Sequence, residues 1–273
     1  MIAAGRFLTV DGIRTHYTES GIGKTIILLH GLGGPLMWQR VVEPLSDKFH
    51  VVVLDLPGWG ESDCPPRPYT AAMYADFVTH FFDAVGIEKV ICAGISFGGQ
   101  VGVHVAAYRP QRVDKLILIC STGLPAGNRL LRSSVFWSLF SFIIRYTVLR
   151  SEYLMCVLAR RSFFDLRTRP QDLCRNFYTQ ISMNGKREAW LNGFRNVYVP
   201  DGDFERRLLE ISSPTLIIWG ENDRTISPGT AQEFQRRIRH SVISIFHTCA
   251  HSVPLEKPRE LFSSILDFSQ STT

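Results

Sequence analysis

The stretch CAGISFGGQ, residues Cys92–Gln100, places one serine between glycines two positions away on either side. Gly94, Ser96 and Gly98 form the pattern G-x-S-x-G, which is typical of a serine on a sharp turn between a strand and a helix. The backbone of such a turn is strained, and bulky neighbours would clash there. The pattern also arises by chance, and a serine before a helix is often an ordinary N-cap. Its meaning therefore depends on the surrounding sequence.

Continuous apolar segments surround this turn along the chain. They are rich in leucine and β-branched residues, which is typical of strands buried on both faces of a parallel sheet. An N-terminal hairpin is also expected, because an Asp-Gly pair at residues 11–12 separates two short segments of strand character. The eight expected strands are contained in RFLTV, IRTHYTES, KTIILLHG, HVVVLDLPG, KVICAGI, VDKLILICS, SPTLIIWG and SVISIF.

Segments of helical length separate most of these strands. Thr70 and Gly86 are suited to cap one of the expected helices at its two ends. Alternation of strands with helices of this length predicts an α/β fold with a mostly parallel eight-stranded sheet flanked by helices. The helices are expected over residues 37–48, 69–85, 98–108, 228–239 and 258–268.

The segment 122–207 departs from this alternation. It contains no strand-like run, and SSVFWSLFSFIIRYTVL is apolar on nearly every face. The segment has 14 Lys and Arg residues against 7 Asp and Glu, a net charge of +7, whereas the rest of the chain carries −2. We interpret residues 122–207 as a mostly helical cap inserted into a core formed by residues 1–121 and 208–273.

The composition indicates a globular domain with an insertion. The 273 residues are 45% hydrophobic and 20% charged, with a formal net charge of +5. No stretch reaches the roughly 18 uninterrupted apolar residues of a transmembrane helix, and the N-terminus lacks a signal-peptide pattern, so a cytoplasmic protein is expected. The basic excess has no interleaved aromatic repeat, which argues against nucleic-acid binding.

Six cysteines without paired spacing are expected to be reduced thiols, with no metal site: Cys64, Cys92, Cys120, Cys156, Cys174 and Cys249.

Three further motifs accompany the serine turn GISFGG. HGLGG follows an expected strand at residues 30–34, WGENDRTISP occupies residues 219–228, and CAHSVPLEKP occupies residues 249–258. With these motifs in this order, the chain resembles the α/β-hydrolase superfamily over essentially all of its length outside the insertion. The resemblance is to capped serine hydrolases of the esterase, lipase or meta-cleavage-product-hydrolase kind, and the order Ser, Asp, His is that of the family.

The resemblance implies a catalytic triad of Ser96, Asp223 and His251. A serine hydroxyl is a weak nucleophile near neutral pH and needs a base to take its proton. His251 would be that base, and Asp223 would orient its ring and stabilise its positive charge. By analogy with the family, the backbone N–H groups of Leu32 and Phe97 would form the oxyanion hole, where each donor is typically worth about 2.7–4 kcal/mol.

Other residues near these motifs compete for the same roles. Asp223 lies in a turn-like segment and can instead be the first residue of an Asx turn. His240 and His247 precede the histidine motif and are expected to be structural. His30 is expected to brace the oxyanion loop rather than to act as a base.

Three positions differ from common family patterns. Ala250 precedes the histidine where many relatives have glycine, which is expected to shift the loop slightly. Ile95 stands where esterases often have histidine and carbon–carbon bond hydrolases often have asparagine, so neither branch is favoured. Ser96 stands where haloalkane dehalogenases and epoxide hydrolases have aspartate, which disfavours those two activities.

The apolar cap indicates a class of substrate. It favours a small hydrophobic carboxylic ester, cleaved through an acyl-enzyme intermediate without a cofactor. Carbon–carbon bond hydrolysis by the same triad is an alternative, because the cap has many arginines that could hold a carboxylate. A non-catalytic ligand-binding protein on the same fold is an alternative from another class. The expected substrate contacts are Gly31, Gly33, Trp137 and Phe140.

The apolar segment of the cap has two interpretations. Its side chains are too numerous for one helix face, so the helix either packs on the core or touches an apolar ligand or a membrane surface. Nearby arginines permit a peripheral contact with anionic lipid. These arginines are Arg129, Arg132, Arg145 and Arg150.

Overall fold

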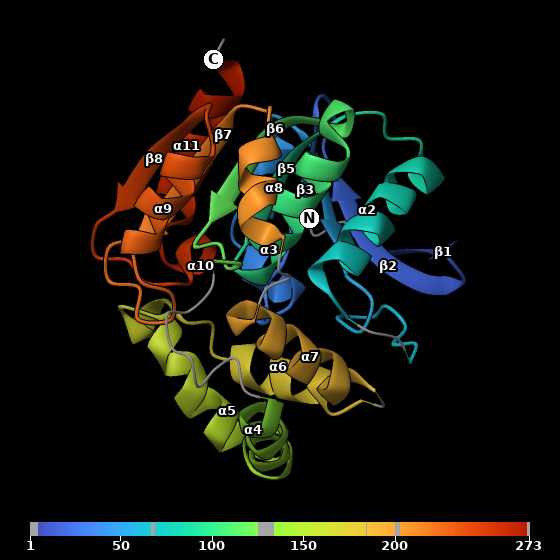
Figure 1. The fold of residues 1–273 in the computed structure, drawn as a ribbon, viewed down its shortest axis with the longest axis vertical. Coiled ribbons are helices and arrows are strands. Elements are labelled where there is room, and N and C mark those ends of the chain that lie inside the picture. The colour runs from blue at the N-terminus through green and yellow to red at the C-terminus, as the bar shows by residue number, and fades with distance from the viewer. Residues whose placement is uncertain (1–4, 67–68, 125–133, 184, 200–202, 272–273) are drawn as a thin grey trace.

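Eight strands form one sheet at the centre of the molecule (Figure 1). The computed structural model describes residues 5–66, 69–124, 134–183, 185–199 and 203–271. Every strand falls within a segment expected from the sequence, so the predicted eight-stranded sheet is confirmed. The strands are β1 Arg6–Val10, β2 Ile13–Ser20, β3 Thr25–Leu29, β4 His50–Leu54, β5 Val90–Ile95, β6 Val113–Ile119, β7 Thr215–Gly220 and β8 Ser241–Phe246.

The strand order is β1-β2-β4-β3-β5-β6-β7-β8. β2 runs antiparallel to β1 and β4, and every other neighbouring pair is parallel. Leu29 at the end of β3 lies opposite Gly94 of β5, and Ile95 lies opposite Ile119 at the end of β6. Because the carboxyl ends of parallel strands share one edge, this register gathers the loops after β3, β5 and β6 where open α/β sheets bind ligands.

Helices cover both faces of the sheet. Adjacent residues of a strand point to opposite faces. On β6, Lys115 donates a hydrogen bond to the carbonyl of Phe268 in α11, whereas Leu116 packs against Gly102 of α3, so α11 and α3 lie on opposite faces. The core helices are α1 Val42–Ser46, α2 Ala71–Val85, α3 Phe97–Tyr108, α8 Phe204–Glu210, α9 Gly229–Arg237, α10 Val253–Glu256 and α11 Pro258–Gln270.

Local sequence explains where two of these helices begin and end. The Thr70 side chain accepts a hydrogen bond from the Met73 N–H at the start of α2, and Gly86 ends the helix with φ 72°, as expected. The single helix expected over residues 37–48 is wrong, because the chain forms a short 3-10 turn and then α1. This break places Pro44 in the first turn of α1, where no helical N–H donor is needed.

The insertion between β6 and α8 is helical and lies below the core in Figure 1. Its end differs from the predicted residue 207, which falls inside α8. The Phe204 ring packs against His104 of α3 at 5.6 Å and Phe234 of α9 at 6.2 Å, so α8 belongs to the core. Arg129 and Arg132 lie outside the described residues. The cap elements are α4 Ser134–Tyr146, η4 Val148–Arg150, α5 Glu152–Ala159, η5 Arg160–Ser162, η6 Leu166–Thr168, α6 Leu173–Ile181 and α7 Lys186–Tyr198.

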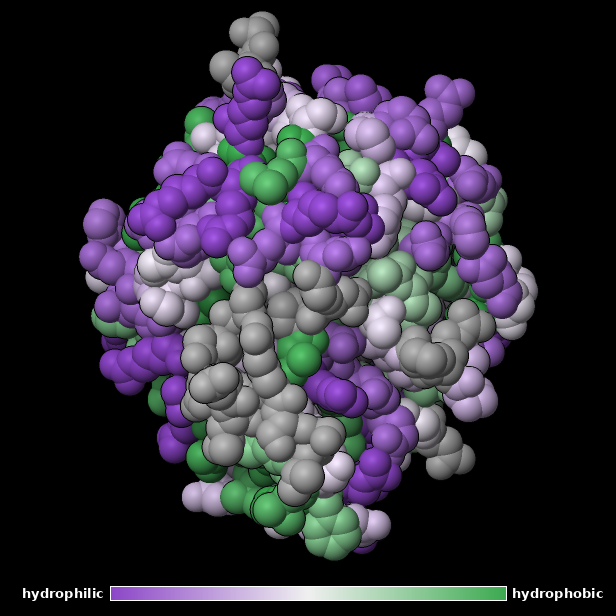
Figure 2. Space-filling model, in the orientation of Figure 1, coloured by the Kyte–Doolittle hydropathy of each residue, from purple (hydrophilic) through white to green (hydrophobic). Residues whose placement is uncertain are grey.

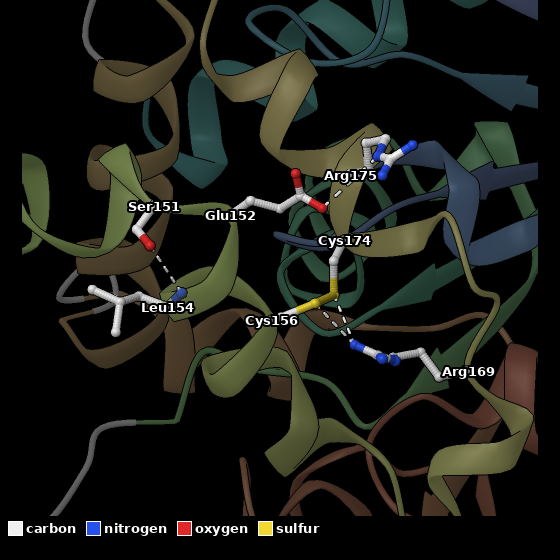
Figure 3. Close-up of a disulfide and its surroundings, with 7 residues drawn as sticks. All are labelled: Ser151, Glu152, Leu154, Cys156, Arg169, Cys174 and Arg175. Atoms are coloured by element: carbon white, nitrogen blue, oxygen red, sulfur yellow. Dashed lines mark hydrogen bonds and ion pairs between the residues drawn. A yellow bond between two sulfur atoms is a disulfide. The ribbon is translucent and has the colours of Figure 1, made fainter.

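A disulfide joins two helices of the cap (Figure 3). It links Cys156 of α5 to Cys174 of α6, and Arg169 donates hydrogen bonds to both sulfur atoms. The expectation that all six cysteines are reduced is therefore wrong for this pair. Their separation of 18 residues matches no recognised spacing, and only the packing of α5 on α6 brings them together. Because disulfides persist mainly in oxidising environments, the bridge gives no support to a cytoplasmic location, which stays a prediction.

Within the described ranges, no helix has both the length and the apolar character needed to cross a bilayer.

The disulfide predicts the number of titratable thiols. Protein denatured without a reductant should expose four thiols per chain, those of Cys64, Cys92, Cys120 and Cys249. After reduction and removal of the reductant, the same titration with a thiol-reactive chromophore should give six. Six thiols before reduction would contradict the bridge.

Candidate active site

Ser96 occupies the junction between β5 and α3 in a strained conformation. Its φ of 54° and ψ of −120° lie in a region that residues other than glycine rarely adopt. Hydrogen bonds hold it there: its N–H donates to the Ile119 carbonyl at 2.9 Å, and its carbonyl accepts from the N–H groups of Gly99 and Thr122. The sharp turn proposed from the sequence is thus present, with the side chain at the edge of the sheet.

The two glycines of G-x-S-x-G are required by close backbone contacts. A Cβ atom on Gly98 would lie 2.1 Å from the Leu29 carbonyl oxygen, and one on Gly94 would lie 2.3 Å from the Gly98 carbonyl oxygen. Neither backbone atom can move without disturbing β3 or α3. The steric explanation given for these glycines is therefore the one that the structure supports.

Asp223 and His251 form a buried hydrogen-bonded pair. His251 Nδ1 lies 2.7 Å from Asp223 Oδ2, and the Asp223 carboxylate is fully shielded from solvent. The other oxygen, Oδ1, accepts from the N–H groups of Thr225 and Ile226 at 2.7 and 3.0 Å. The two interpretations of Asp223 hold together, because one oxygen closes a turn while the other binds the histidine.

Three separate loops bring these residues to one cavity. Ser96 follows β5, Asp223 follows β7, and His251 follows β8, and both Ser96 and His251 line the same space. Two competing histidines lie elsewhere: His247 is exposed and pairs with Glu221, and His240 is exposed at the other end of β8. His251 is therefore the histidine that the fold brings to the cavity with Ser96.

His30 fixes the glycine-rich loop that follows β3. Its Nδ1 lies 2.8 Å from the Gly31 carbonyl and its Nε2 accepts from the Leu56 N–H at 3.2 Å, so the hydrogen is on Nδ1. Burial lowers the pKa of His30, which keeps the ring neutral. The loop then turns back through a hydrogen bond from the Gly34 N–H to the Gly31 carbonyl. His30 thus has the bracing position expected of it.

The residues expected to form the oxyanion hole lie close to Ser96. A Cβ on Gly31 would lie 2.8 Å from the Ser96 Cβ, so this loop runs directly against the serine, and Leu32 lines the cavity. Phe97 is the first residue of α3, where backbone N–H groups have no partner within the helix. The assignment of the Leu32 and Phe97 N–H groups to the oxyanion hole stays a prediction.

The cavity above Ser96 has a volume of about 310 Å³, which is within the range of small-molecule sites. Core residues form its floor, and α5, α6 and α7 form its roof and walls. Most lining side chains are apolar. They include Leu32, Met37, Ile95, Met155, Leu158, Phe163, Leu173, Phe177, Trp190, Phe194, Val197 and Tyr198.

An aromatic stripe on α7 forms one wall of the cavity. Trp190, Phe194 and Tyr198 are four residues apart and share one side of the helix. Trp137 and Phe140, which were expected to contact substrate, do not line the cavity; they pack against Phe194 at 6.2 and 5.4 Å from α4. This expectation is corrected because α7 lies between α4 and the cavity. Gly31 and Gly33 do line it, as expected.

Two arginines at the cavity were not singled out from the sequence. Arg161 and Arg224 both line it, and both are exposed, so their charges remain hydrated. Arg161 also donates a hydrogen bond to the Arg224 carbonyl, which joins the cap to the loop of Asp223. The WGENDR motif contains Arg224 beside the acid, whereas nothing in the local sequence distinguishes Arg161 from other cap arginines.

Cys120 lies behind the acid–base pair. Its sulfur, Asp223 and His251 form the one group among the described residues with metal-ligand spacing, all within 4.8 Å. Asp223 and His251 are already hydrogen-bonded to each other, so the donor atoms face each other rather than a shared point. Burial raises the pKa of the Cys120 thiol well above its usual range, and the charge of Asp223 raises it further. The thiol is therefore neutral at physiological pH.

Glu256 connects the cap to the loop that carries His251. Its Oε1 accepts from the N–H groups of Phe164 and Asp165 at 2.7 and 3.1 Å, and its Oε2 accepts from the Ala250 N–H at 2.8 Å. Burial raises the pKa of this carboxyl, while the three N–H donors oppose the rise. One carboxylate thus holds a cap loop, residues 164–165, and the residue before His251 together.

The residue after His251 is held by the same cap segment. The Ser252 N–H donates to the Ser162 carbonyl at 2.9 Å. Both backbone neighbours of His251 are therefore tied to residues 162–165, either directly or through Glu256. The position of His251 therefore depends on this part of the cap.

Residues 24–258 match the sequence model of a protein family described as alpha/beta hydrolase fold. This match covers every loop that carries the serine, the acid and the histidine. The chain belongs to this family.

Relatives of this α/β hydrolase have different activities. It is 30% identical to a 2-hydroxy-6-oxononadienedioate/2-hydroxy-6-oxononatrienedioate hydrolase of Klebsiella pneumoniae, over 97% of this chain and 96% of the relative. It is also 30% identical to the dihydrolipoyllysine-residue acetyltransferase component of the acetoin cleaving system of Cupriavidus necator, over 97% of this chain and 68% of the relative.

Solved structures that are similar to this chain also differ in their named activities. A bacterial membrane phospholipase A superposes with a TM-score of 0.82 at 28% identity, over 97% of this chain and 85% of that one. A meta-cleavage product hydrolase from Pseudomonas fluorescens IP01 has a TM-score of 0.82 at 22% identity, over 98% of both chains; at that identity the likeness shows the fold alone. These proteins share the fold of this chain and differ in their named activities.

The close contacts of Gly98 make it intolerant of a side chain. Gly98→Ala should lower the free energy of unfolding by more than about 3 kcal/mol, because the new methyl group meets the Leu29 carbonyl. The matched control is Gly229→Ala at the start of α9, where the nearest atom is 3.6 Å away and the change should stay within about 1 kcal/mol. Urea unfolding measures both, and equal stability of the two variants would contradict the argument.

The bridge made by Glu256 should matter for turnover. Glu256→Gln should lower kcat about tenfold on a short soluble ester, because the amide group presents donors to backbone N–H groups and displaces the His251 loop. KM should change little, since Glu256 does not line the cavity.

The control for this variant is Glu260→Gln, one turn further on. That carboxylate is largely exposed and pairs with Lys257 at 3.6 Å, so kcat should stay unchanged. Equal kcat for both variants and wild type would show that the cap segment does not position the base.

Proposed function

We propose that this α/β hydrolase is a serine hydrolase that cleaves a carboxylic ester with an apolar acyl group. Ser96 Oγ attacks the ester carbonyl while His251 Nε2 takes its proton, and the N–H groups of Leu32 and Phe97 donate to the oxyanion. His251 then protonates the departing alcohol, which leaves an acyl-enzyme. Water, deprotonated by the same nitrogen, hydrolyses this ester and frees Ser96.

The apolar lining of the cavity carries the proposal. Most of the side chains that line the cavity with Ser96 are aliphatic or aromatic, and Ile95, beside the nucleophile, adds to this character. A substrate anion placed among them would lose its hydration without gaining a buried cation. An apolar acyl chain, in contrast, gains from leaving water. The 28% identity to a structure described as a membrane phospholipase A is consistent with an ester of this kind.

A second candidate is hydrolytic cleavage of a carbon–carbon bond. The Klebsiella pneumoniae relative is named as a hydrolase of an oxononadienedioate, and Arg161 and Arg224 at the cavity could pair with a carboxylate. Against it, both arginines are exposed, so they suit one anionic group at the rim better than a dicarboxylate held beside Ser96.

Labelling tests the nucleophile. A fluorophosphonate probe should label wild-type protein and not Ser96→Ala, and ester turnover should fall on the order of 10⁴–10⁶-fold in that variant. Ser138→Ala, an exposed serine on α4, is the matched control and should behave as wild type. A folded wild type that takes no label would overturn the proposal and favour a ligand-binding protein.

Substrate series separate the two reactions. Across p-nitrophenyl esters, kcat/KM should rise with acyl length until the cavity is filled. A ring-cleavage dienoate should show no loss of its absorbance at the same enzyme concentration. Decay of the dienoate at rates above those of every ester would instead establish the second candidate.

A further inference from the structure

Most of the large apolar side chains that are exposed in the described part of the chain lie on the cap. Figure 2 shows apolar surface at the lower end of the molecule, the end occupied by α4 in Figure 1. We use the name outer cap face for the exposed apolar side chains of α4 and α5 that do not line the cavity. These are Leu139, Phe142, Ile143, Tyr146, Tyr153, Leu154 and Val157.

The α4 part of the outer cap face is a regular stripe. Leu139, Phe142, Ile143 and Tyr146 follow the spacing of one helix side, and Leu139 and Phe142 each expose 61% of their surface. The opposite side carries Trp137, which is buried against α7. The helix is thus apolar on both sides. Only its inward side packs against the rest of the protein, and the outward side is left exposed.

The α5 part connects the outer cap face to the cavity. Tyr153, Leu154 and Val157 point outward with 74%, 38% and 41% of their surface exposed. Met155 and Leu158 of the same helix line the cavity above Ser96. A single helix therefore has one side toward the substrate site and another toward the surroundings.

Positive charge accompanies this apolar surface. Residues 134–168 contain five arginines against two acidic residues. Arg150, between α4 and α5, is exposed and lies over the Tyr146 ring at 5.4 Å, and Arg160 is exposed directly after α5. Apolar side chains with arginines beside them are the pattern by which amphipathic helices lie on anionic lipid.

We propose that the outer cap face docks on an anionic lipid surface and so places the opening of the cavity at the source of an apolar ester. The charge favours lipid over a second copy of this chain, because a two-fold interface would set the same arginines of both copies against each other. The part of this inference that concerns substrate delivery rests on the proposed ester hydrolysis, whereas docking itself does not.

Vesicle flotation tests the docking. Ser96→Ala protein is used so that lipid is not consumed, with vesicles of phosphatidylcholine alone or with added phosphatidylglycerol. Binding should require phosphatidylglycerol and weaken as salt rises. The double variant Phe142→Ser with Ile143→Ser should bind at least tenfold more weakly, and Arg150→Glu and Arg160→Glu should each weaken binding about fivefold or more.

Matched controls lie on the core. Val242→Ser removes an apolar side chain that is 51% exposed on β8, and Arg239→Glu reverses an exposed charge beside it; both should bind as the parent protein does. Binding that is absent with both vesicles, or equally weakened by these controls, would overturn the proposal. So would a dimer in light scattering without lipid that the α4 double variant converts to a monomer.

Turnover of a short soluble ester separates the two proposals. With Ser96 restored, the outer cap face variants should keep wild-type kcat, because their side chains lie outside the cavity. Vesicle binding without any ester turnover would leave docking standing and remove the proposed reaction. Ester turnover without vesicle binding would leave the proposed reaction standing and remove the docking.

Discussion

The left-handed backbone at Ser96 is the constraint on which the site depends. A serine at φ 54° raises the conformational energy of the backbone. The conformation persists because contacts with the neighbouring backbone hold it. Gly98 sits against the Leu29 carbonyl, and the Ser96 N–H is bound by Ile119. The same contacts that force the turn also place the Ser96 side chain at the cavity and start α3 directly after it. The strained backbone of Ser96 and the position of its side chain therefore have one cause.

The acid and the base are held from two directions. The core supplies Asp223, whose second oxygen is fixed by the turn that follows it. The cap supplies the other support, since Glu256 and the Ser162 carbonyl hold the residues on both sides of His251. A cap that only covered the cavity would need none of these bonds. Here residues 162–165 of the cap are bonded to both backbone neighbours of His251, either directly or through Glu256, so the cap supports the position of the histidine.

Much of the core could be predicted from the sequence because its rules are local. Most strands were apolar runs, the N-terminal hairpin followed from its Asp-Gly turn, and four motifs in the family's order predicted the serine, the acid and the histidine. The helix expected over residues 37–48 failed because Pro44 restricts where a helix can begin. The cap was harder, since its contacts are tertiary: the spacing of Trp190, Phe194 and Tyr198 was visible, but only the structure shows that this stripe, rather than Trp137, faces the cavity. The Cys156–Cys174 bridge and the role of Glu256 likewise depend on segments that meet only after folding.

Helix α5 faces two environments, the cavity on one side and the exterior of the cap on the other. Its Met155 side adds apolar surface to the cavity, and its Tyr153 side exposes aromatic surface beside arginines. A hydrolase with a small, water-soluble, acidic substrate would need neither the apolar cavity wall nor the exposed aromatic surface. A hydrolase whose substrate partitions into lipid gains from both, because the ester can pass from one apolar environment to another along a single helix without full exposure to water. The disulfide from α5 to α6 then has a mechanical consequence: it ties the helix that would face the lipid to a second wall of the cavity.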